Sequence, residues 1–338
     1  MMTCGRSKNV KQPFLPRKLT ATYACMMVVT WLCVFFTAAL GRAQDESTRN
    51  HPTPFRIALS GGTFVTANPY DAQAAVKAWA KTILQQRGIV QEVQTRIFQS
   101  TEALFEALNK RQVDAAAMLT EEFMKMEDKP DSVFLSMRKN SFTEQYVLLV
   151  HRNSGIDDID KLLGRKLLLH SNPKTSLASA WLDTLLAEQS LGFPEQVLES
   201  KNHIENASKA VLQVFFGQTD ACIVTANVFA VVSELNPQVR NTLRVIATSP
   251  EVIPSLFFFR SDYTMGIRDS LEEALVGLHE SPSGQQVLMI FQGDQMKKKP
   301  ASCLENSRKL VQKAQRLRRP LKGGEKSPLS QVRDNAKN

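Results

Sequence analysis

Cysteine, histidine and tyrosine are scarce in this chain of 338 residues, which has five cysteines, five histidines and four tyrosines. Three of the cysteines fall within the first 43 residues, so only Cys222 and Cys303 remain for the rest of the chain. Two cysteines cannot build the disulfide framework of a small secreted domain or the cysteine set of a structural zinc site. The folded part must therefore be held by its own apolar core, which about 250 residues can supply.

The same scarcity argues against a metal centre, and the absence of several motifs argues against catalysis. The histidines show no metal-ligand spacing, and Tyr70, Tyr146 and Tyr263 are not the adjacent tyrosines that hold ferric ion in some two-lobed proteins. The chain contains no G-x-x-x-x-G-K-[ST] loop, no G-x-G-x-x-G fingerprint and no G-x-S-x-G elbow. Nucleotide binding and serine-hydrolase chemistry therefore have no support. We expect no cofactor, no metal and no enzymatic activity.

Acidic residues are almost missing from the two ends of the chain, which explains its net charge of +9. Residues 1–43 contain six Lys/Arg and no acidic residue, and residues 296–338 contain 13 Lys/Arg and three acidic residues. Residues 44–295 hold 23 basic and 30 acidic residues, whereas a nucleic-acid-binding fold would carry its positive charge in the core. We therefore expect no nucleic-acid partner, and we expect residues 296–338 to form a basic, flexible tail.

The first 43 residues have the layout of a secretory signal. A basic start is followed by a strongly apolar run from Ala21 to Leu40, and Gly41 and Ala43 are small residues where a signal peptidase cleaves. We predict a signal peptide over residues 1–43 and a periplasmic location for the remainder. The apolar run of about 20 residues is also long enough to span a bilayer, so an uncleaved membrane anchor is the alternative.

From Pro54 onward, short apolar runs alternate with segments of helical periodicity. We predict strands at 55–60, 93–98, 113–119, 145–150, 166–170, 220–224, 243–248 and 255–260. We predict helices at 70–87, 101–111, 175–189, 206–217, 226–234, 268–280 and 282–291. Strands that alternate with helices of this length indicate an α/β fold with parallel sheets covered on both faces.

Two segments of this pattern resemble each other. KRQVDAAAMLTEEF (110–123) and FGQTDACIVTANVF (216–229) share a helix end, Gln-x-Asp-Ala, a buried strand, a threonine and a further helix. They predict two βα lobes of similar build, one over 50–145 plus 255–295 and one over 150–248. Ligands on open α/β sheets bind at the carboxyl ends of the strands. Two such lobes, joined by a hinge, can close an interlobe cleft around a ligand.

The loop SNPKTS (171–176) follows the predicted strand 166–170 and precedes a helix. A helix start has unpaired N–H groups and a partial positive charge, and both attract oxyanions. The hydroxyls of Thr175 and Ser176 and the ammonium of Lys174 are candidates to complete such a site. The alternative is an ordinary helix cap with nothing bound, because Ser and Thr cap helices routinely.

Further candidate ligand-binding residues follow the other strands. Gly61 and Gly62 allow a close approach of the backbone in the loop after strand 55–60, and the threonines at 120 and 225 end the two repeated strands. Together with the neighbouring polar residues, this set comprises Ser60, Gly61, Gly62, Thr63, Tyr70, Thr120, Thr225 and Asn227.

Over roughly residues 55–292, the chain resembles the periplasmic phosphonate/phosphite/phosphate-binding proteins of ABC transporters. The segments that carry the resemblance are EALNKRQVDAA, YVLLVHRNSGIDDIDKLLGRKLLLHSNPKTS, VFFGQTDAC and IATSPEVIPSLFFFR. In that family, a D-P-x-S-T-S-G loop holds the phosphonate oxygens. Thr175 and Ser176 match this loop, whereas Lys174 replaces its first serine and Leu177 its glycine. The family's Tyr-Gly at the end of the first repeated strand is Met118-Leu119 here, and its histidine falls near Ala207.

The resemblance implies a periplasmic binding protein-like fold that captures a small oxyanion for an ABC permease in the inner membrane. It implies a monomer that does no chemistry on its ligand. A membrane-tethered or soluble ligand sensor of the same fold, which signals to a partner, is the alternative function.

Overall fold

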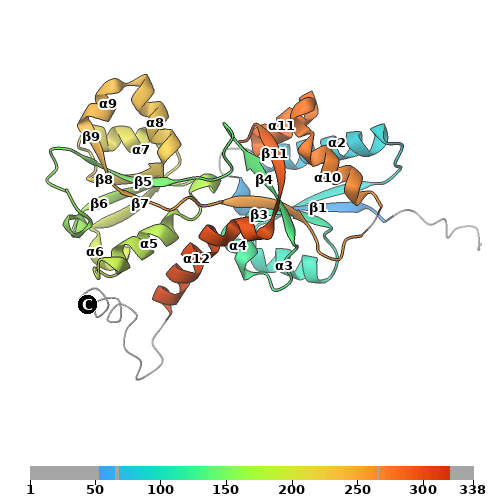
Figure 1. Cartoon of the computed structure of the whole chain (residues 1–338), viewed down its shortest axis with the longest axis horizontal. Coiled ribbons are helices and arrows are strands. Elements are labelled where there is room, and N and C mark those ends of the chain that lie inside the picture. The colour runs from blue at the N-terminus through green and yellow to red at the C-terminus, as the bar shows by residue number, and fades with distance from the viewer. Residues whose placement is uncertain (1–52, 65–67, 265, 320–338) are drawn as a thin grey trace, which may run out of the picture. The chain divides into compact units, whose positions relative to one another are not determined.

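The computed structural model describes residues 53–64, 68–264 and 266–319 (Figure 1). All of these residues belong to one compact unit that begins at Thr53. Residues 1–43, for which we predicted a signal peptide, lie outside the described residues, so that prediction remains open. Within the described part, none of the helices combines the length and the apolar character that crossing a membrane requires.

The first sheet has six strands in the order β11-β4-β10-β3-β1-β2. β1 pairs in parallel with β2 and β3, β10 runs antiparallel to β3 and β4, and β11 runs antiparallel to β4. The strands are β1 (Phe55–Ser60), β2 (Val93–Phe98), β3 (Ala115–Leu119), β4 (Ser132–Met137), β10 (Ser255–Phe259) and β11 (Gln295–Pro300).

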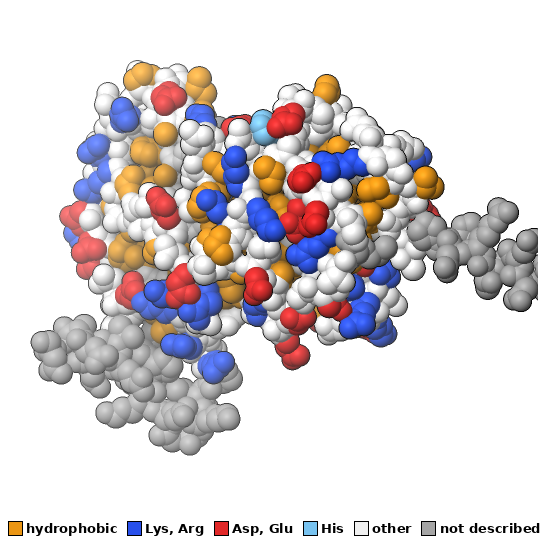
Figure 2. Space-filling model, turned by 45° about the vertical axis from the view of Figure 1, so that its right-hand side comes forward, with side chains coloured by type: hydrophobic (Ala, Val, Ile, Leu, Met, Phe, Trp, Pro, Cys, Tyr) orange, Lys and Arg blue, Asp and Glu red, His pale blue; other side chains and the backbone are white. Residues whose placement is uncertain are grey.

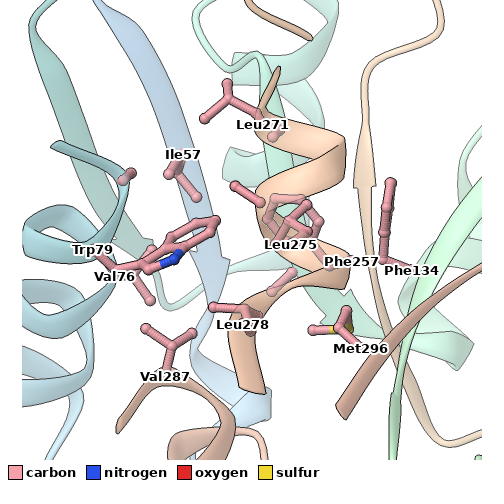
Figure 3. Packing of buried hydrophobic residues seen from close by; sticks show 14 of the residues in the cluster. Ile57, Val76, Trp79, Phe134, Phe257, Leu271, Leu275, Leu278, Val287 and Met296 are labelled. Atoms are coloured by element: carbon pink, nitrogen blue, oxygen red, sulfur yellow. The ribbon is translucent and has the colours of Figure 1, made fainter. Parts of the chain in front are cut away.

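Apolar side chains cover both faces of this sheet. Because neighbouring residues of a strand point to opposite faces, Phe257 and Phe259 belong to one core cluster and Phe258 to the other. The first cluster, shown in Figure 3, lies under α2 (Pro69–Gln86), α10 (Arg268–Val276) and α11 (Pro282–Ile290). The second lies under α3 (Thr101–Asn109) and α4 (Thr120–Lys125).

The second sheet has five strands in the order β7-β6-β8-β5-β9. They are β5 (Tyr146–His151), β6 (Lys166–His170), β7 (Ser200–Ile204), β8 (Ala221–Thr225) and β9 (Leu243–Thr248). One face packs on α5 (Ala178–Glu188) and α6 (Pro194–Val197), and the other on α7 (Ala207–Phe215), α8 (Ala226–Leu235) and α9 (Pro237–Thr242). The two sheets together confirm the predicted α/β architecture with two βα halves.

The prediction of parallel sheets is correct only in part, because both sheets are mixed. β6, β7 and β8 are parallel to one another, but β5 is antiparallel to both β8 and β9. In the first sheet β10 is likewise antiparallel. The physical reason is that β5 and β10 are the strands by which the chain enters each sheet from the other one. Each therefore starts at the edge where the parallel strands of its sheet have their carboxyl ends, and runs toward the opposite edge.

The prediction of a flexible tail is also wrong over residues 296–318. Residues 295–300 form the edge strand β11, and residues 305–318 form the helix α12 (Glu305–Arg318). Leu310, Val311, Ala314 and Leu317 recur at helical spacing and are buried, while the basic residues occupy the exposed face. α12 packs on α5 and on α4, so it contacts helices of both sheets (Figure 1). Residues 320–338 lie outside the described residues.

Basic and acidic side chains are intermixed over the face of the molecule in Figure 2, rather than gathered by sign. Charged residues of the described part form ion pairs, such as the half-exposed Arg56 with the buried Asp114 at 2.8 Å and the exposed Arg87 with Glu273 at 2.8 Å. Exposed pairs like the second contribute about 0–1 kcal/mol each to stability. The visible face therefore has no single basic area of the type that a nucleic acid would need.

Candidate functional site

The loop after β6 is shaped by its own side chains. Pro173 begins a short 3-10 turn, η3 (Pro173–Thr175), and the Asn172 side chain accepts a hydrogen bond from the Lys174 N–H at 3.0 Å. The Thr175 hydroxyl accepts a hydrogen bond from the Asn172 N–H at 3.0 Å and donates to the His170 carbonyl at 2.5 Å. These bonds fix the backbone of the loop before α5 begins at Ala178.

The hydroxyls of Thr175 and Ser176 are used differently from what we expected. Thr175 is 3% exposed, and its hydroxyl proton goes to the backbone of the loop itself. The Ser176 hydroxyl donates to the Pro254 carbonyl at 3.2 Å, and neither residue caps α5, whose N-cap position is Leu177. Both side chains therefore position the loop, and their direct contact with a ligand stays a prediction.

Tyr146 holds this loop in place through a hydrogen bond. Its hydroxyl donates to the Lys174 carbonyl at 3.0 Å, and its ring packs against Trp181 with 6.2 Å between ring centroids. Burial raises the pKa of the Tyr146 phenol, and the charges of Glu144 and Glu121 raise it further, against the opposing effect of the Leu177 N–H. The phenol therefore stays protonated and remains a hydrogen-bond donor to the loop.

The Lys174 side chain forms an ion pair with Glu144. The ammonium lies 2.9 Å from a Glu144 carboxylate oxygen, and the two side chains are only 21% and 16% exposed. Glu144 belongs to one of the two segments that cross between the sheets, and its backbone pairs with Val252 of the other through hydrogen bonds of 2.7 and 2.9 Å. The loop of the second sheet is thereby tied to the crossing segments.

The Pro254 carbonyl joins the two sheets at the same place. It accepts the Thr120 N–H at the start of α4 at 2.8 Å, and the Ser176 hydroxyl from the other sheet. The Thr120 hydroxyl is buried and has no hydrogen-bond partner among the described residues. The ends of β3 and β6 thus meet around Pro254, as ligand sites at the carboxyl ends of strands require.

The loop after β1 uses its polar side chains within the protein, including a contact with the buried carboxylate of Glu122 on α4. The Ser60 hydroxyl donates to Glu122 at 2.7 Å and accepts the Gly62 N–H at 3.3 Å, and the Thr63 hydroxyl donates to the Ser60 carbonyl at 2.6 Å. A Cβ atom on Gly62 would lie 2.8 Å from the Leu119 side chain, which would then have to shift. The polar atoms of this loop therefore serve its own structure.

A small cavity opens between the two loops and the crossing segments, with a volume of about 40 Å³ for water-sized probes. By the criterion that one water needs about 10–15 Å³ of such space, it holds only a few waters or one small polyatomic ion. Its polar lining residues are Thr63, Ser136, Arg138, Ser141, Glu144, Lys174, Ser255 and Gln292. Of the residues predicted from the sequence, the structure places Lys174 and Thr63 in this lining.

The other predicted residues lie apart from the cavity lining. Tyr70 is 78% exposed on the first turn of α2. Thr225 is buried and caps α8 by accepting the Val228 N–H at 3.3 Å, and Asn227 is exposed on that helix. His170 is buried, which lowers its pKa, and its Nε2 atom lies 3.2 Å from the Glu205 carbonyl. The neutral, structural form of this histidine fits that environment best.

Arg138 and Glu144 are the charged lining residues that sequence reasoning missed. They lie in the segment between β4 and β5, where neither hydrophobic periodicity nor a glycine-rich motif marks them. Only the pairing of this segment with residues more than a hundred positions later brings them to the cavity. The charged lining residues are thus two cations, Arg138 and Lys174, and one anion, Glu144.

Replacement of Thr175 by valine tests the positioning role of its hydroxyl. We expect Thr175→Val to lower the free energy of unfolding by about 1–3 kcal/mol, because the half-buried Asn172 N–H and the buried His170 carbonyl each lose a partner. Urea unfolding followed by circular dichroism measures the effect. Thr219→Val is the control, since its hydroxyl donates to the Lys166 carbonyl near the surface. An equal decrease in the free energy of unfolding for the two variants would show that the Thr175 hydroxyl has no particular role in positioning the loop.

Two α/β sheets linked by crossing segments, with a polar cavity at the carboxyl ends of their strands, define the class of two-lobed solute-binding proteins. The family model described as "ABC transporter, phosphonate, periplasmic substrate-binding protein" matches residues 62–301. The chain therefore belongs to the periplasmic phosphonate-binding proteins of ABC transporters. No curated protein matches it in sequence.

Solved structures confirm the fold. A binding-protein component of an ABC phosphonate transporter from Pseudomonas aeruginosa is 14% identical, with a TM-score of 0.53 over 84% of this chain and 96% of that one. PhnD1 from Prochlorococcus marinus, in complex with methylphosphonate, is 16% identical, with a TM-score of 0.53 over 78% and 99%. A Xanthomonas citri protein bound to ATP is 14% identical, with a TM-score of 0.56 over 78% and 98%.

Proposed function

We propose that this protein captures a small phosphonate- or phosphate-like oxyanion in the periplasm and delivers it, as a monomer, to an ABC permease in the inner membrane. The observation that carries the proposal is the ammonium of Lys174, mostly buried in the cavity lining beside the start of α5. A lysine in that place is a point charge suited to an oxyanion. The family of the chain supports the same ligand class.

The positive charges near the cavity support this proposal. The N–H groups at the start of a helix carry a partial positive charge, and α5 follows the Lys174 loop directly. Arg138 adds a second cation to the lining and, among the described residues, has no ion-pair partner. These groups suit binding and release of an anion, and no chemical change of the ligand forms part of the proposal.

A thermal-shift screen of the full chain tests the proposal. Phosphate, phosphite, sulfate and methylphosphonate are the probes. A ligand present at 100 times its Kd should stabilise the folded state by about 2.7 kcal/mol. We expect such a shift with at least one phosphorus oxyanion and none with choline, a cation of similar size. The absence of a shift with every anion would contradict the proposal.

A further inference from the structure

The candidate anion site contains a carboxylate that an anion must meet. Glu144 lies 2.9 Å from the Lys174 ammonium, and both residues line the cavity. An oxyanion that contacts Lys174 therefore has its oxygen atoms close to the Glu144 carboxylate. The Glu144 carboxylate and an oxyanion in such close contact repel each other unless a proton lies between them.

The backbone on both sides of the ion pair is fixed. Glu144 exchanges two hydrogen bonds with Val252, at 2.7 and 2.9 Å. The Lys174 carbonyl accepts the Tyr146 hydroxyl at 3.0 Å, and its N–H donates to the Asn172 side chain at 3.0 Å. Neither residue can leave the cavity by a shift of the loop alone, so the carboxylate remains beside any ion that reaches Lys174.

Among the described residues, Lys174 alone forms an ion pair with Glu144. Arg138, the other cation in the lining, is exposed and forms no ion pair among the described residues. Glu121 is a second carboxylate near Tyr146, since its charge contributes to the raised pKa of that phenol. The site thus offers the Lys174 ammonium as a hydrogen-bond donor and, next to it, the Glu144 carboxylate as an acceptor.

A carboxylate accepts hydrogen bonds and donates none. A ligand that satisfies both groups must present a charged oxygen to Lys174 and an O–H to Glu144. A singly protonated phosphonate, phosphite or phosphate carries both groups on one phosphorus atom. Sulfate and sulfonates are fully ionised at neutral pH and carry only acceptors.

We propose that Glu144 is the specificity residue of this site, and that it selects singly protonated phosphorus oxyanions over sulfate and sulfonates. This inference rests on the proposed function, because it concerns the same cavity. Glu144 contacts the ligand directly by accepting its O–H, while Lys174 binds the charged oxygen. The Lys174–Glu144 ion pair opens when the ligand takes its place between the two side chains.

Isothermal titration of the full chain with methylphosphonate and methanesulfonate at pH 6.5 tests this inference. The two probes have the same methyl group and a similar shape, and they differ in the P–OH. A hydrogen bond to a charged group is worth about 1.5–3 kcal/mol, so we expect methylphosphonate to bind at least about tenfold more tightly. In Glu144→Gln this preference should fall to about threefold or less, chiefly because methanesulfonate binds better, since the amide group can donate to it.

Glu251→Gln is the matched control, because Glu251 is an exposed glutamate of the other crossing segment and does not line the cavity. It should keep the wild-type preference. Equal binding of both probes by the wild type, or an unchanged preference in Glu144→Gln, would overturn the inference and leave the proposed function intact. If neither the wild type nor Glu144→Gln binds either probe, the inference is wrong, and the thermal-shift screen with phosphate and phosphite then decides the proposed function.

Discussion

A chain that ends at Leu304 is expected to be less stable than one that ends at Arg319 by more than about 4 kcal/mol. The difference between the two chains is α12, whose Leu310 and Val311 belong to the core cluster of the second sheet. Loss of one buried Leu or Ile side chain costs about 2–5 kcal/mol, and α12 buries several such groups. Since the whole free energy of unfolding of a protein is about 5–15 kcal/mol, this loss is severe.

Polar contacts of α12 add to the effect. The Ser307 hydroxyl accepts the Ile253 N–H at 2.7 Å and donates to the Ile253 carbonyl at 3.2 Å. Arg318 binds the carboxylate of Asp183, which is 5% exposed. Without α12, that carboxylate loses its cation and the Ile253 backbone loses its partner, and buried groups left unpaired in this way are costly.

Urea unfolding of the two truncated chains measures the difference. Point variants keep the test meaningful if the shorter chain does not fold. Leu310→Ala should lower the free energy of unfolding by about 2–5 kcal/mol, whereas Lys309→Ala, on the exposed face of α12, should change it by less than about 0.5 kcal/mol. The same urea midpoint for chains ending at Leu304 and Arg319 would show that α12 does not stabilise the fold.

Reversal of the charge at Lys174 is expected to weaken binding of the ligand by about a hundredfold or more. Lys174→Glu removes a charge-assisted hydrogen bond worth about 1.5–3 kcal/mol. It also places a second carboxylate opposite Glu144, and such like-charge contacts cost several kcal/mol when a further anion must bind. Each 1.4 kcal/mol corresponds to a tenfold change in Kd.

Calorimetric titration with the tightest phosphorus oxyanion from the thermal-shift screen measures this effect. Lys161→Glu makes the same change of charge at an exposed lysine in the 3-10 turn η2 (Ile159–Leu162), where Lys161 pairs with Asp157. It should change the Kd by less than about threefold, because exposed charges are screened by salt. If the two reversals weaken binding equally, Lys174 does not contact the ligand.

The sequence predicts the bounds of four strands as the structure has them. VQTRIF and LRVIAT lie at sheet edges and are partly exposed, whereas FRIALS and KLLLH are buried along almost their whole length. Apolar side chains on both faces produce continuous runs that are hard to mistake. β7 (SKNHI) and β11 (QMKKKP) are edge strands with exposed polar residues, and their sequences carry no such signal. Exposed lysines on an edge strand are common, because they oppose pairing with another chain.

α12 is a helix in a segment that we predicted to be a flexible tail because of its net positive charge. Its basic residues suggested a flexible tail, although four apolar residues recur along it at helical spacing. Long charged side chains can occupy one face of a helix while the opposite face is buried. The periodicity of the apolar residues, rather than the number of charges, was the informative property.

The candidate site was predictable only in part. Of the residues predicted at the strand ends, Lys174 and Thr63 line the cavity, and their contact with a ligand stays a prediction. The small hydroxyl residues nearby were weaker guides, because Ser60, Thr63, Thr175 and Ser176 use their hydroxyls within the protein. Glu144 and Arg138 reach the site through long-range pairing of the crossing segments, which local sequence cannot reveal.

A crystal structure of the full chain with bound methylphosphonate tests the central claim most directly. We predict the anion in the cavity between the two sheets, with one oxygen within hydrogen-bond distance of the Lys174 Nζ atom and another at the Glu144 carboxylate. Methylphosphonate bound elsewhere, for example at the surface pocket that contains Lys77 and Arg96, with the Lys174–Glu144 ion pair unchanged, would contradict the account.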